Sequence, residues 1–375
     1  MRAVPVKRSP MTENLAVTVL QTPLATQLAS VVHAPRLSEF HGVLTPHEFD
    51  VPAREIEALA RGAAAHDLGW MRRVSVRGED RFRWLSGMVT NTVNDLPANG
   101  GAWNLVLNAQ GRIQGDLTVW RDGDALELVI AADQYDKLLA HLDRFIIMDD
   151  VELVAHDAAA ETTVGLTGTH AREVLARMGL PVPAETMTWQ RVEWNGLDLK
   201  IYRNYGTLAD HFEIATPLAG LTLLWRALST AGATPVGNAA LEAFRVAEGI
   251  PVYGVDMAER DLPQETSQTR ALHFSKGCYL GQEIVERIRS RGNVHRHLRQ
   301  LELDGPAAKL GAELFLEGAP VGTITSTAEL AFGGSIRCVA LGMVRSEAEV
   351  KSQPLTYVAG TTAGTAKILD KPPAL

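Results

Sequence analysis

Strands and helices alternate along the first half of the chain, as the spacing of its apolar residues shows. Strict alternation of apolar and polar positions predicts short strands, and apolar positions three and four residues apart predict helices. The turn sequence Asn108-Ala-Gln-Gly111 separates two alternating stretches and predicts a β-hairpin. The predicted strands are 74–76, 103–107, 113–120 and 126–130, and the predicted helices begin at Pro52 or cover 81–88 and about 135–145.

A similar alternation begins again at Thr163. Asn195-Gly196 lies between two strand-like stretches and is a strong signal for a type I′ hairpin turn. We therefore predict an α+β fold of two related modules, each built on an antiparallel sheet. The elements of the second module are predicted strands over 164–166, 192–194, 197–202 and 212–215 and predicted helices over 170–178, 218–231 and 239–248.

Beyond His297 the pattern changes to short, evenly spaced strands with glycine turns, predicted over 298–303, 313–316, 321–326, 339–344 and 356–358. Such spacing predicts a small antiparallel barrel or sandwich as a separate C-terminal domain. The first 40 residues have scattered prolines and little periodicity, and Met11 is an alternative start to Met1. The predicted organisation is a loosely structured lead-in over 1–40, a core of two modules over 41–290 and a β-barrel domain over 291–375.

Composition and charge narrow the possible functions. The 375 residues are 46% hydrophobic and carry a formal charge of −8, which argues against a protein whose main role is to wrap nucleic acid. A basic stretch from Lys276 to Arg299 is nevertheless open to two interpretations, a solvated face or an anion-binding surface. Two cysteines are too few for a disulfide framework and fit a reducing compartment. No apolar run is long enough to span a bilayer, and we predict a cytoplasmic protein without membrane partners.

The stretch Lys276-Gly-Cys-Tyr-Leu-Gly-Gln-Glu283 is the most distinctive in the chain. Apolar residues at helical spacing follow it, so Cys278 is predicted in a glycine-containing loop that leads into a helix. A helix N-terminus and the nearby Lys276 favour ionisation of a thiol, which makes Cys278 a candidate reactive residue. The alternative is a small buried cysteine without chemistry.

Other polar residues interrupt apolar segments and are candidate site residues. Asp116 and Glu213 lie within predicted strands, where each is open to a site role or to a solvent-facing position. Arg245 and Glu248 lie three apart on one predicted helix, where an ion pair between them is the simpler interpretation. Tyr253 follows a turn. No metal-ligand spacing, phosphate-binding loop or dinucleotide-binding motif is present.

Several of these stretches resemble the folate-binding superfamily that contains the glycine-cleavage T protein, an aminomethyltransferase. The resemblance covers roughly residues 40–370. It rests on segments that include Gly111-Arg-Ile-Gln-Gly-Asp116, the stretch from Arg203 to Ile214 and Arg245-Val-Ala-Glu-Gly-Ile-Pro-Val-Tyr-Gly254. It implies a three-lobed fold with tetrahydrofolate in a central channel, contacted by Asp116, Glu213, Arg245 and Tyr253.

Within this superfamily, residues 276–283 resemble the YgfZ-type branch, whose members assist the assembly or repair of iron-sulfur clusters. The resemblance implies that Cys278 is the working thiol, with iron-sulfur client or assembly proteins as partners. Lys276 and Gln282 would orient the loop. The remaining residues of this predicted motif loop are Gly277, Tyr279, Gly281 and Glu283.

The sequence also departs from the transferase. Where the transferase has two adjacent acids, this chain has Gly115-Asp116, and the segment Tyr205-Gly-Thr-Leu-Ala-Asp-His211 replaces Gly-Tyr-Thr-Gly-Glu-Asp-Gly. The leading prediction is therefore a folate-binding accessory factor for iron-sulfur proteins. The alternative is a tetrahydrofolate-dependent one-carbon transferase or demethylase that uses Asp116. A weaker third hypothesis is an RNA-modification partner that uses the basic stretch 287–299.

Overall fold

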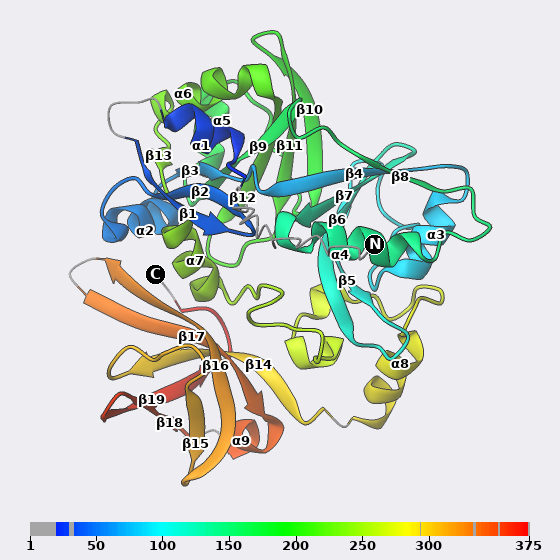
Figure 1. Cartoon of the computed structure of the whole chain (residues 1–375). Coiled ribbons are helices and arrows are strands. Elements are labelled where there is room, and N and C mark those ends of the chain that lie inside the picture. The colour runs from blue at the N-terminus through cyan, green and yellow to red at the C-terminus, as the bar shows by residue number, and fades with distance from the viewer. Residues whose placement is uncertain (1–19, 30–33, 293, 333–334, 352, 374–375) are drawn as a thin grey trace, which may run out of the picture.

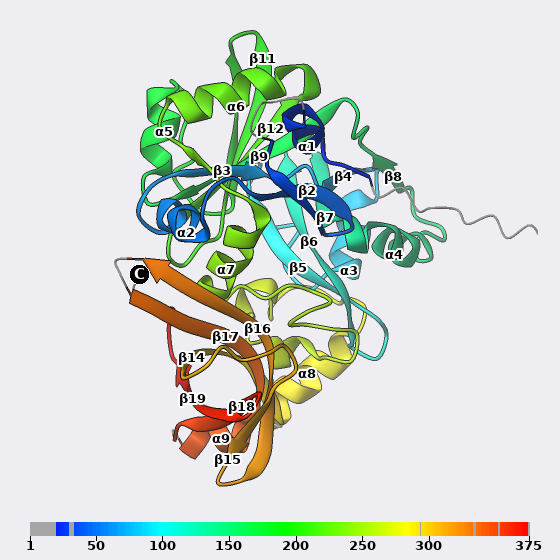
Figure 2. The ribbon, with the colours of Figure 1, turned by 60° about the vertical axis from the view of Figure 1, so that its left-hand side comes forward.

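The computed structural model describes residues 20–29, 34–292, 294–332, 335–351 and 353–373. Two sheets, each flanked by helices, form the upper part of the molecule, and a closed β-barrel lies below them in both views (Figures 1 and 2). Neighbouring strands are antiparallel except for the short pair β3 and β13. The predicted α+β class with antiparallel sheets and a C-terminal barrel is therefore confirmed.

The first module is a five-stranded sheet in the order β5-β6-β7-β4-β8. Its β5-β6 hairpin closes around the predicted turn, where Gly111 has a φ of +70°. Helices α3 and α4 cover the apolar face, which includes the fully buried Val74 and Leu128. The elements are β4 (Met71–Arg77), α3 (Arg81–Met88), β5 (Gly101–Leu107), β6 (Ile113–Asp122), β7 (Ala125–Ala131), α4 (Ala132–Asp143) and β8 (Glu152–Ala155).

The second module is a six-stranded sheet in the order β10-β11-β12-β9-β3-β13. Asn195 and Gly196 both have positive φ, +50° and +76°, as the predicted type I′ turn requires. Helices α5 and α6 pack on the face that carries Leu166 and Phe212. The elements are β3 (Ala64–Asp67), β9 (Glu161–Gly168), α5 (Ala171–Arg177), β10 (Thr188–Trp194), β11 (Leu197–Asn204), β12 (Asp210–Pro217), η1 (Leu218–Gly220), α6 (Leu221–Thr230) and β13 (Thr234–Pro235).

The barrel closes in the order β14-β17-β16-β15-β18-β19. Helices α2 and α7 pack between it and the six-stranded sheet through a shared apolar cluster that includes Ile56, Phe244 and Leu330. The elements are α2 (Pro52–Arg61), α7 (Asn238–Glu248), η2 (Pro263–Thr266), η3 (Thr269–Ala271), α8 (Gln282–Arg291), β14 (Arg296–Asp304), β15 (Glu313–Leu316), β16 (Ala319–Phe332), β17 (Ser335–Arg345), α9 (Ser346–Lys351), β18 (Leu355–Ala359) and β19 (Thr362–Leu369).

The predicted lead-in over residues 1–40 lies in large part outside the described residues. Its described part contains α1 (Pro23–Leu28) and β1 (Arg36–Phe40), and β1 pairs with β2 (Val43–Glu48). The domain boundaries near residues 40 and 290 stay a prediction. Among the described helices, none combines the length and apolarity needed to cross a membrane.

Asp67, at the end of β3, links the lead-in to the second module and gives stability a pH dependence. The Thr22 hydroxyl and the Gly69 N-H both donate to its carboxylate, and the side chain is buried. Burial raises the pKa of Asp67 from 3.8 to about 6 despite these hydrogen bonds. The folded state therefore holds this proton more tightly than the unfolded state, and stability is lost as the pH rises through that range.

We expect Asp67→Asn to remove this loss. The free energy of unfolding of the variant minus that of the wild type should rise by roughly 3 kcal/mol from about pH 4 to pH 7. The reason is that each unit of the pKa shift in the wild type corresponds to about 1.4 kcal/mol. Urea unfolding of both proteins across this range measures the difference. Asp124→Asn, at an exposed turn, is the matched control. A difference that stays constant with pH would contradict this assignment.

Candidate functional site

Two adjoining cavities lie between the modules, and both are lined by Asn204 and Ile250. The first has a volume of about 380 Å³ and includes Trp103 and Asp116 of the first module. The second has a volume of about 250 Å³ and includes polar residues of the six-stranded sheet. Pockets formed between modules, with a few convergent polar groups on apolar walls, are typical ligand sites. We call this pair of spaces the central cavity.

Strand register places polar side chains on the cavity face of the six-stranded sheet. Gly165 of β9 is paired with both His66 of β3 and Glu213 of β12, and Thr167 of β9 is paired with His211 of β12. Because side chains alternate along a strand, these residues share one face. The residues between them point into the apolar core beneath α5 and α6. The alternation therefore gives the cavity one polar wall, which we call the cavity floor and which consists of His66, Thr167, His211 and Glu213.

Glu213 is buried on this floor, and the alternative of a solvent-facing glutamate is wrong. Its Oε1 accepts a hydrogen bond from the Asn204 amide. Its Oε2 has no hydrogen-bond partner in the described part of the chain and lies 3.8 Å from the Arg73 guanidinium. Burial raises the pKa of Glu213, while Arg73 opposes that rise. Glu213 thus lines the cavity and keeps one oxygen that accepts no hydrogen bond from the described residues.

Asp116 of β6 lies half-buried at the wall of the central cavity. The indole N-H of Trp103 donates to its Oδ2 at 2.8 Å, and the Gln134 amide donates to its Oδ1 at 3.0 Å. Burial raises the pKa of Asp116, and these two hydrogen bonds act against the rise. The carboxyl group is thereby fixed in orientation, with lone pairs left for a ligand.

Arg245 lines the cavity but is engaged elsewhere. Its guanidinium donates to Asp256 at 2.5 Å, to Glu242 at 3.0 Å and to the Ser326 hydroxyl at 2.9 Å. The expected ion pair between Arg245 and Glu248 is not formed, because Glu248 lies 2.7 Å from the His211 ring instead. Arg245 therefore connects α7 to the barrel by hydrogen bonds, and we do not propose that it binds an anionic group of a ligand.

Tyr253 does not line the central cavity. Its hydroxyl accepts a hydrogen bond from the Lys137 ammonium at 2.9 Å, on the surface of the molecule. A direct contact between Tyr253 and a ligand in the central cavity is thus not supported by the geometry.

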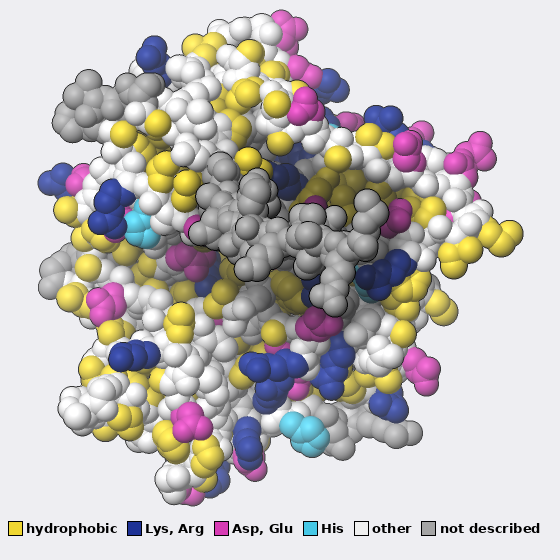
Figure 3. Space-filling view, in the orientation of Figure 1, with side chains coloured by type: hydrophobic (Ala, Val, Ile, Leu, Met, Phe, Trp, Pro, Cys, Tyr) yellow, Lys and Arg dark blue, Asp and Glu magenta, His cyan; other side chains and the backbone are white. Residues whose placement is uncertain are grey.

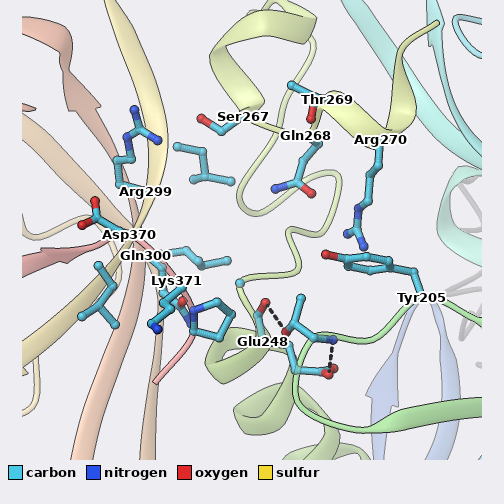
Figure 4. A pocket seen from close by; sticks show the side chains of 16 residues that line it. Tyr205, Glu248, Ser267, Gln268, Thr269, Arg270, Arg299, Gln300, Asp370 and Lys371 are labelled. Atoms are coloured by element: carbon cyan, nitrogen blue, oxygen red, sulfur yellow. Dashed lines mark hydrogen bonds between the residues drawn. The ribbon is translucent and has the colours of Figure 1, made fainter. Parts of the chain in front are cut away.

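A third cavity, of about 290 Å³, opens between the core and the barrel (Figure 4). Tyr205 and Arg270 line both it and the central cavity. The Arg270 guanidinium lies 3.8 Å from the centre of the Tyr205 ring and 4.8 Å from that of Trp103. Its Nε has no hydrogen-bond partner among the described residues, and burial lowers the pKa of Arg270 to about 10. Arg270 remains a cation at neutral pH and can receive an anionic ligand group.

The motif loop lies apart from these cavities. Cys278 is exposed and does not line the central cavity or the third cavity. Helix α8 starts at Gln282, four residues later, so Cys278 is not at the helix N-terminus as the sequence suggested. The alternative of a buried cysteine is also wrong. A catalytic role for Cys278 stays a prediction.

Lys276 and Gln282 make hydrogen bonds to the backbone in and beside the loop, and their predicted orienting role stays a prediction. The Lys276 ammonium donates to the carbonyl oxygens of Val89 and Asn91, each at 2.6 Å, so it is directed at backbone rather than at the thiol. The Tyr279 N-H donates to the Gln282 side chain at 3.3 Å. The other loop residues differ in setting: Tyr279 is buried, Gly277 and Glu283 are exposed, and Gly281, with φ +81°, packs on Gly111.

The basic stretch is partly neutralised by acidic neighbours. Arg296 pairs with Asp261 at 2.7 Å, and Arg299 pairs with Glu349. On the face drawn in Figure 3, Lys and Arg side chains lie interspersed with Asp and Glu. A role of this stretch in RNA binding stays a prediction.

The polar cavity residues that the sequence analysis missed include His66, His211 and Arg270. His66 lies on β3, a four-residue strand without clear alternation, which was not predicted. His211 replaces the glycine of the transferase segment, and this departure is the signal that could have identified it. Arg270 lies in an irregular polar stretch where no periodicity guides interpretation.

Comparisons with known proteins agree with this architecture. A family model described as the GCVT N-terminal domain matches residues 24–276, more than half of the chain, and the chain therefore belongs to this family. An aminomethyltransferase of Nostoc sp. is 28% identical over 383 residues, 96% of this chain and 97% of the relative. An aminomethyltransferase of Rubrobacter xylanophilus is 28% identical over 313 residues, 82% of this chain and 83% of the relative.

Among solved structures, the glycine cleavage system aminomethyltransferase T from Bartonella henselae has the same fold. Its TM-score is 0.83, and the match covers 95% of this chain and 98% of that protein at 22% sequence identity. The fold predicted from the sequence resemblance is thereby confirmed.

The leading functional prediction, an accessory factor for iron-sulfur proteins, is wrong. The relatives that match over most of this chain are named aminomethyltransferase, which favours the alternative of a folate-dependent transferase. The prediction depended on the eight residues 276–283, whereas the relatives match over most of the length. Among the described residues, no group of three or more His, Cys, Asp or Glu side chains is placed to hold a metal ion.

Proposed function

We propose that the protein is a tetrahydrofolate-dependent one-carbon transferase of the aminomethyltransferase kind. The observation that carries this proposal is the central cavity, which brings Asp116 of one module and Glu213 of the other to one space. Two relatives named aminomethyltransferase support the reaction class.

The residues present fit a folate. A carboxylate accepts paired hydrogen bonds from the amino group and ring N-H of a pterin, and Glu213 has an oxygen without a hydrogen-bond partner among the described residues. Trp103 and Phe40 supply flat apolar walls in the two parts of the cavity. Arg270, between the central and third cavities, can pair with a carboxylate of the folate. When bound, tetrahydrofolate supplies the two nitrogens that accept the one-carbon unit, one in the reduced pterin ring and one in the aminobenzoyl part.

Asp116 is the residue that we assign to the reaction. Transfer of an aminomethyl group from a thiol breaks the carbon-sulfur and carbon-nitrogen bonds and releases a thiol and ammonia. The two protons that these products gain equal the two lost by the accepting nitrogens, so the reaction needs no oxidant. Asp116, fixed by Trp103 and Gln134, is placed to hydrogen-bond an accepting N-H and to polarise it as a proton is lost.

The test uses the purified full-length protein, tetrahydrofolate and an S-aminomethyl thiol labelled with ¹³C at its methylene carbon. We expect labelled methylenetetrahydrofolate and ammonia in equal amounts, at a rate proportional to protein concentration. Omission of tetrahydrofolate should stop ammonia release. Product formation no faster than in a reaction without protein would dismiss the proposed function.

We also propose, from residues 276–283, that the chain belongs to the YgfZ-type branch of this family. The support is the sequence of the loop and its anchoring by Lys276.

A further inference from the structure

Four buried or half-buried side chains form a continuous polar chain along the cavity floor. Glu248 lies 2.7 Å from the Nε2 atom of His211. The Nδ1 atom of His211 lies 3.2 Å from the Thr167 hydroxyl oxygen, and the same oxygen lies 3.0 Å from the Nε2 atom of His66. All four residues line the part of the central cavity that contains Glu213.

The charge on His211 decides the tautomer of His66. Burial favours the neutral ring of His211, but the Glu248 carboxylate, 2.7 Å from its Nε2 atom, raises the pKa of His211 and stabilises the form with a proton on both ring nitrogens. In that form, the His211 Nδ1-H donates to the Thr167 oxygen, and the single Thr167 hydroxyl proton is donated to the Nε2 atom of His66. Burial lowers the pKa of His66 to about 3, which favours its neutral ring. With Nε2 as the acceptor, the one proton of His66 is on Nδ1.

The Nδ1-H of His66 is consequently a donor without a protein acceptor among the described residues, although only 5% of the residue is exposed. Buried polar groups are normally paired, so such an atom beside a cavity indicates a ligand partner. Gly165 makes the arrangement possible, because a Cβ there would lie 1.9 Å from the Cε1 atom of His66. On the opposite side of β9, Gly165 is paired with Glu213 of β12. The Oε2 atom of Glu213 also has no hydrogen-bond partner among the described residues.

We propose that His66 and Glu213 together select a ligand edge that carries a carbonyl oxygen beside N-H donors, the lactam edge of a 4-oxopterin. Glu213 accepts from the N-H groups and His66 donates to the oxygen. A 4-amino pteridine presents a donor where His66 also donates, and it lacks the ring proton next to that position. The site therefore discriminates against it. This inference rests on the proposed folate-binding function and specifies its ligand selectivity.

The experiment compares folic acid with aminopterin, which differ only by the exchange of the 4-oxo for the 4-amino group. Isothermal titration calorimetry with the wild-type full chain should show at least roughly tenfold tighter binding of folic acid, because an unpaired buried donor is costly. His66→Phe keeps a flat ring over Gly165 but removes the donor, and the ratio of the two affinities should fall to near one. His170→Phe, on the exposed start of the α5 region, should leave the ratio unchanged.

A second measurement does not depend on a folded variant at position 66. The ¹⁵N shifts of the His66 ring in the wild type should report a proton on Nδ1, and Thr167→Val should remove that fixed tautomer. Equal affinity of the wild type for the two ligands, or a His66 proton on Nε2, overturns the inference and leaves the proposed function standing. If neither folic acid nor tetrahydrofolate binds, the proposed function itself fails.

Discussion

Asp116→Asn should lower the rate of one-carbon transfer by about 100-fold, a typical loss for a removed acid-base group. The amide keeps the size of the side chain and can accept from Trp103, but it cannot take up or stabilise a proton from the folate nitrogen. Folate affinity should change little, because Glu213 and Arg270 provide the other polar contacts. Single-turnover rates with the labelled donor, together with a titration of folate binding, separate the two effects.

Asp122→Asn is the matched control for this variant. Asp122 ends the same strand, β6, outside the central cavity, and pairs with Lys200 at 3.2 Å. It should retain the wild-type rate. A rate for Asp116→Asn within about threefold of the wild type would assign the proton transfer to another group, since general acid-base catalysis contributes far more than this factor.

Local signals in the sequence were sufficient for most of the fold. Asn195-Gly196 favours the type I′ turn because both positions need positive φ, and the structure has this turn. The predicted helix over 81–88 coincides with α3. In the barrel, the predicted strands lie within β14 to β18. Strand β19 was missed because its first six residues are small or polar and show no apolar alternation.

The burial and the partners of the site residues depend on contacts that the spacing of apolar residues along the chain does not predict. Alternation places Glu213 opposite the apolar core, but only the packing of the first module over that face makes it buried. The Arg245 guanidinium donates hydrogen bonds to Asp256 and Ser326 and does not pair with Glu248, because the barrel strand β16 lies beside α7. Partners far apart in sequence decide which of two plausible roles a polar residue takes.

The two modules are joined by a buried ion cluster as well as by apolar contacts. Trp120 and Val129 of the first sheet pack against Trp189, Tyr202 and Ala215 of the second in one cluster. Beside this cluster, Arg73 of β4 donates to Glu127 of β7 and lies 3.8 Å from Glu213 of β12. The Tyr202 hydroxyl donates to Glu127 at 3.1 Å. Arg73 therefore lies between two buried carboxylates, one from each module, and opposes the charge of both.

Arg73→Met should lower the free energy of unfolding by about 3–5 kcal/mol, because Glu127 and Glu213 would remain buried without their cation. Methionine keeps much of the apolar stem, so the loss of packing is small. Urea unfolding followed by both fluorescence and circular dichroism measures the change and tests for a single transition. Arg77→Met, an exposed position on the same strand, is the control and should change stability little.

The double variant Arg73→Met/Glu127→Leu identifies the cause of that loss. If the uncompensated charge is responsible, removal of the Glu127 carboxylate should restore a large part of the lost stability, since a buried ion pair replaced by apolar groups is often close to neutral. Glu213 would keep its own carboxylate, so recovery should be incomplete. A double variant less stable than Arg73→Met would show that Arg73 acts through its stacking on Tyr202, 4.7 Å from the ring centre, and through packing instead.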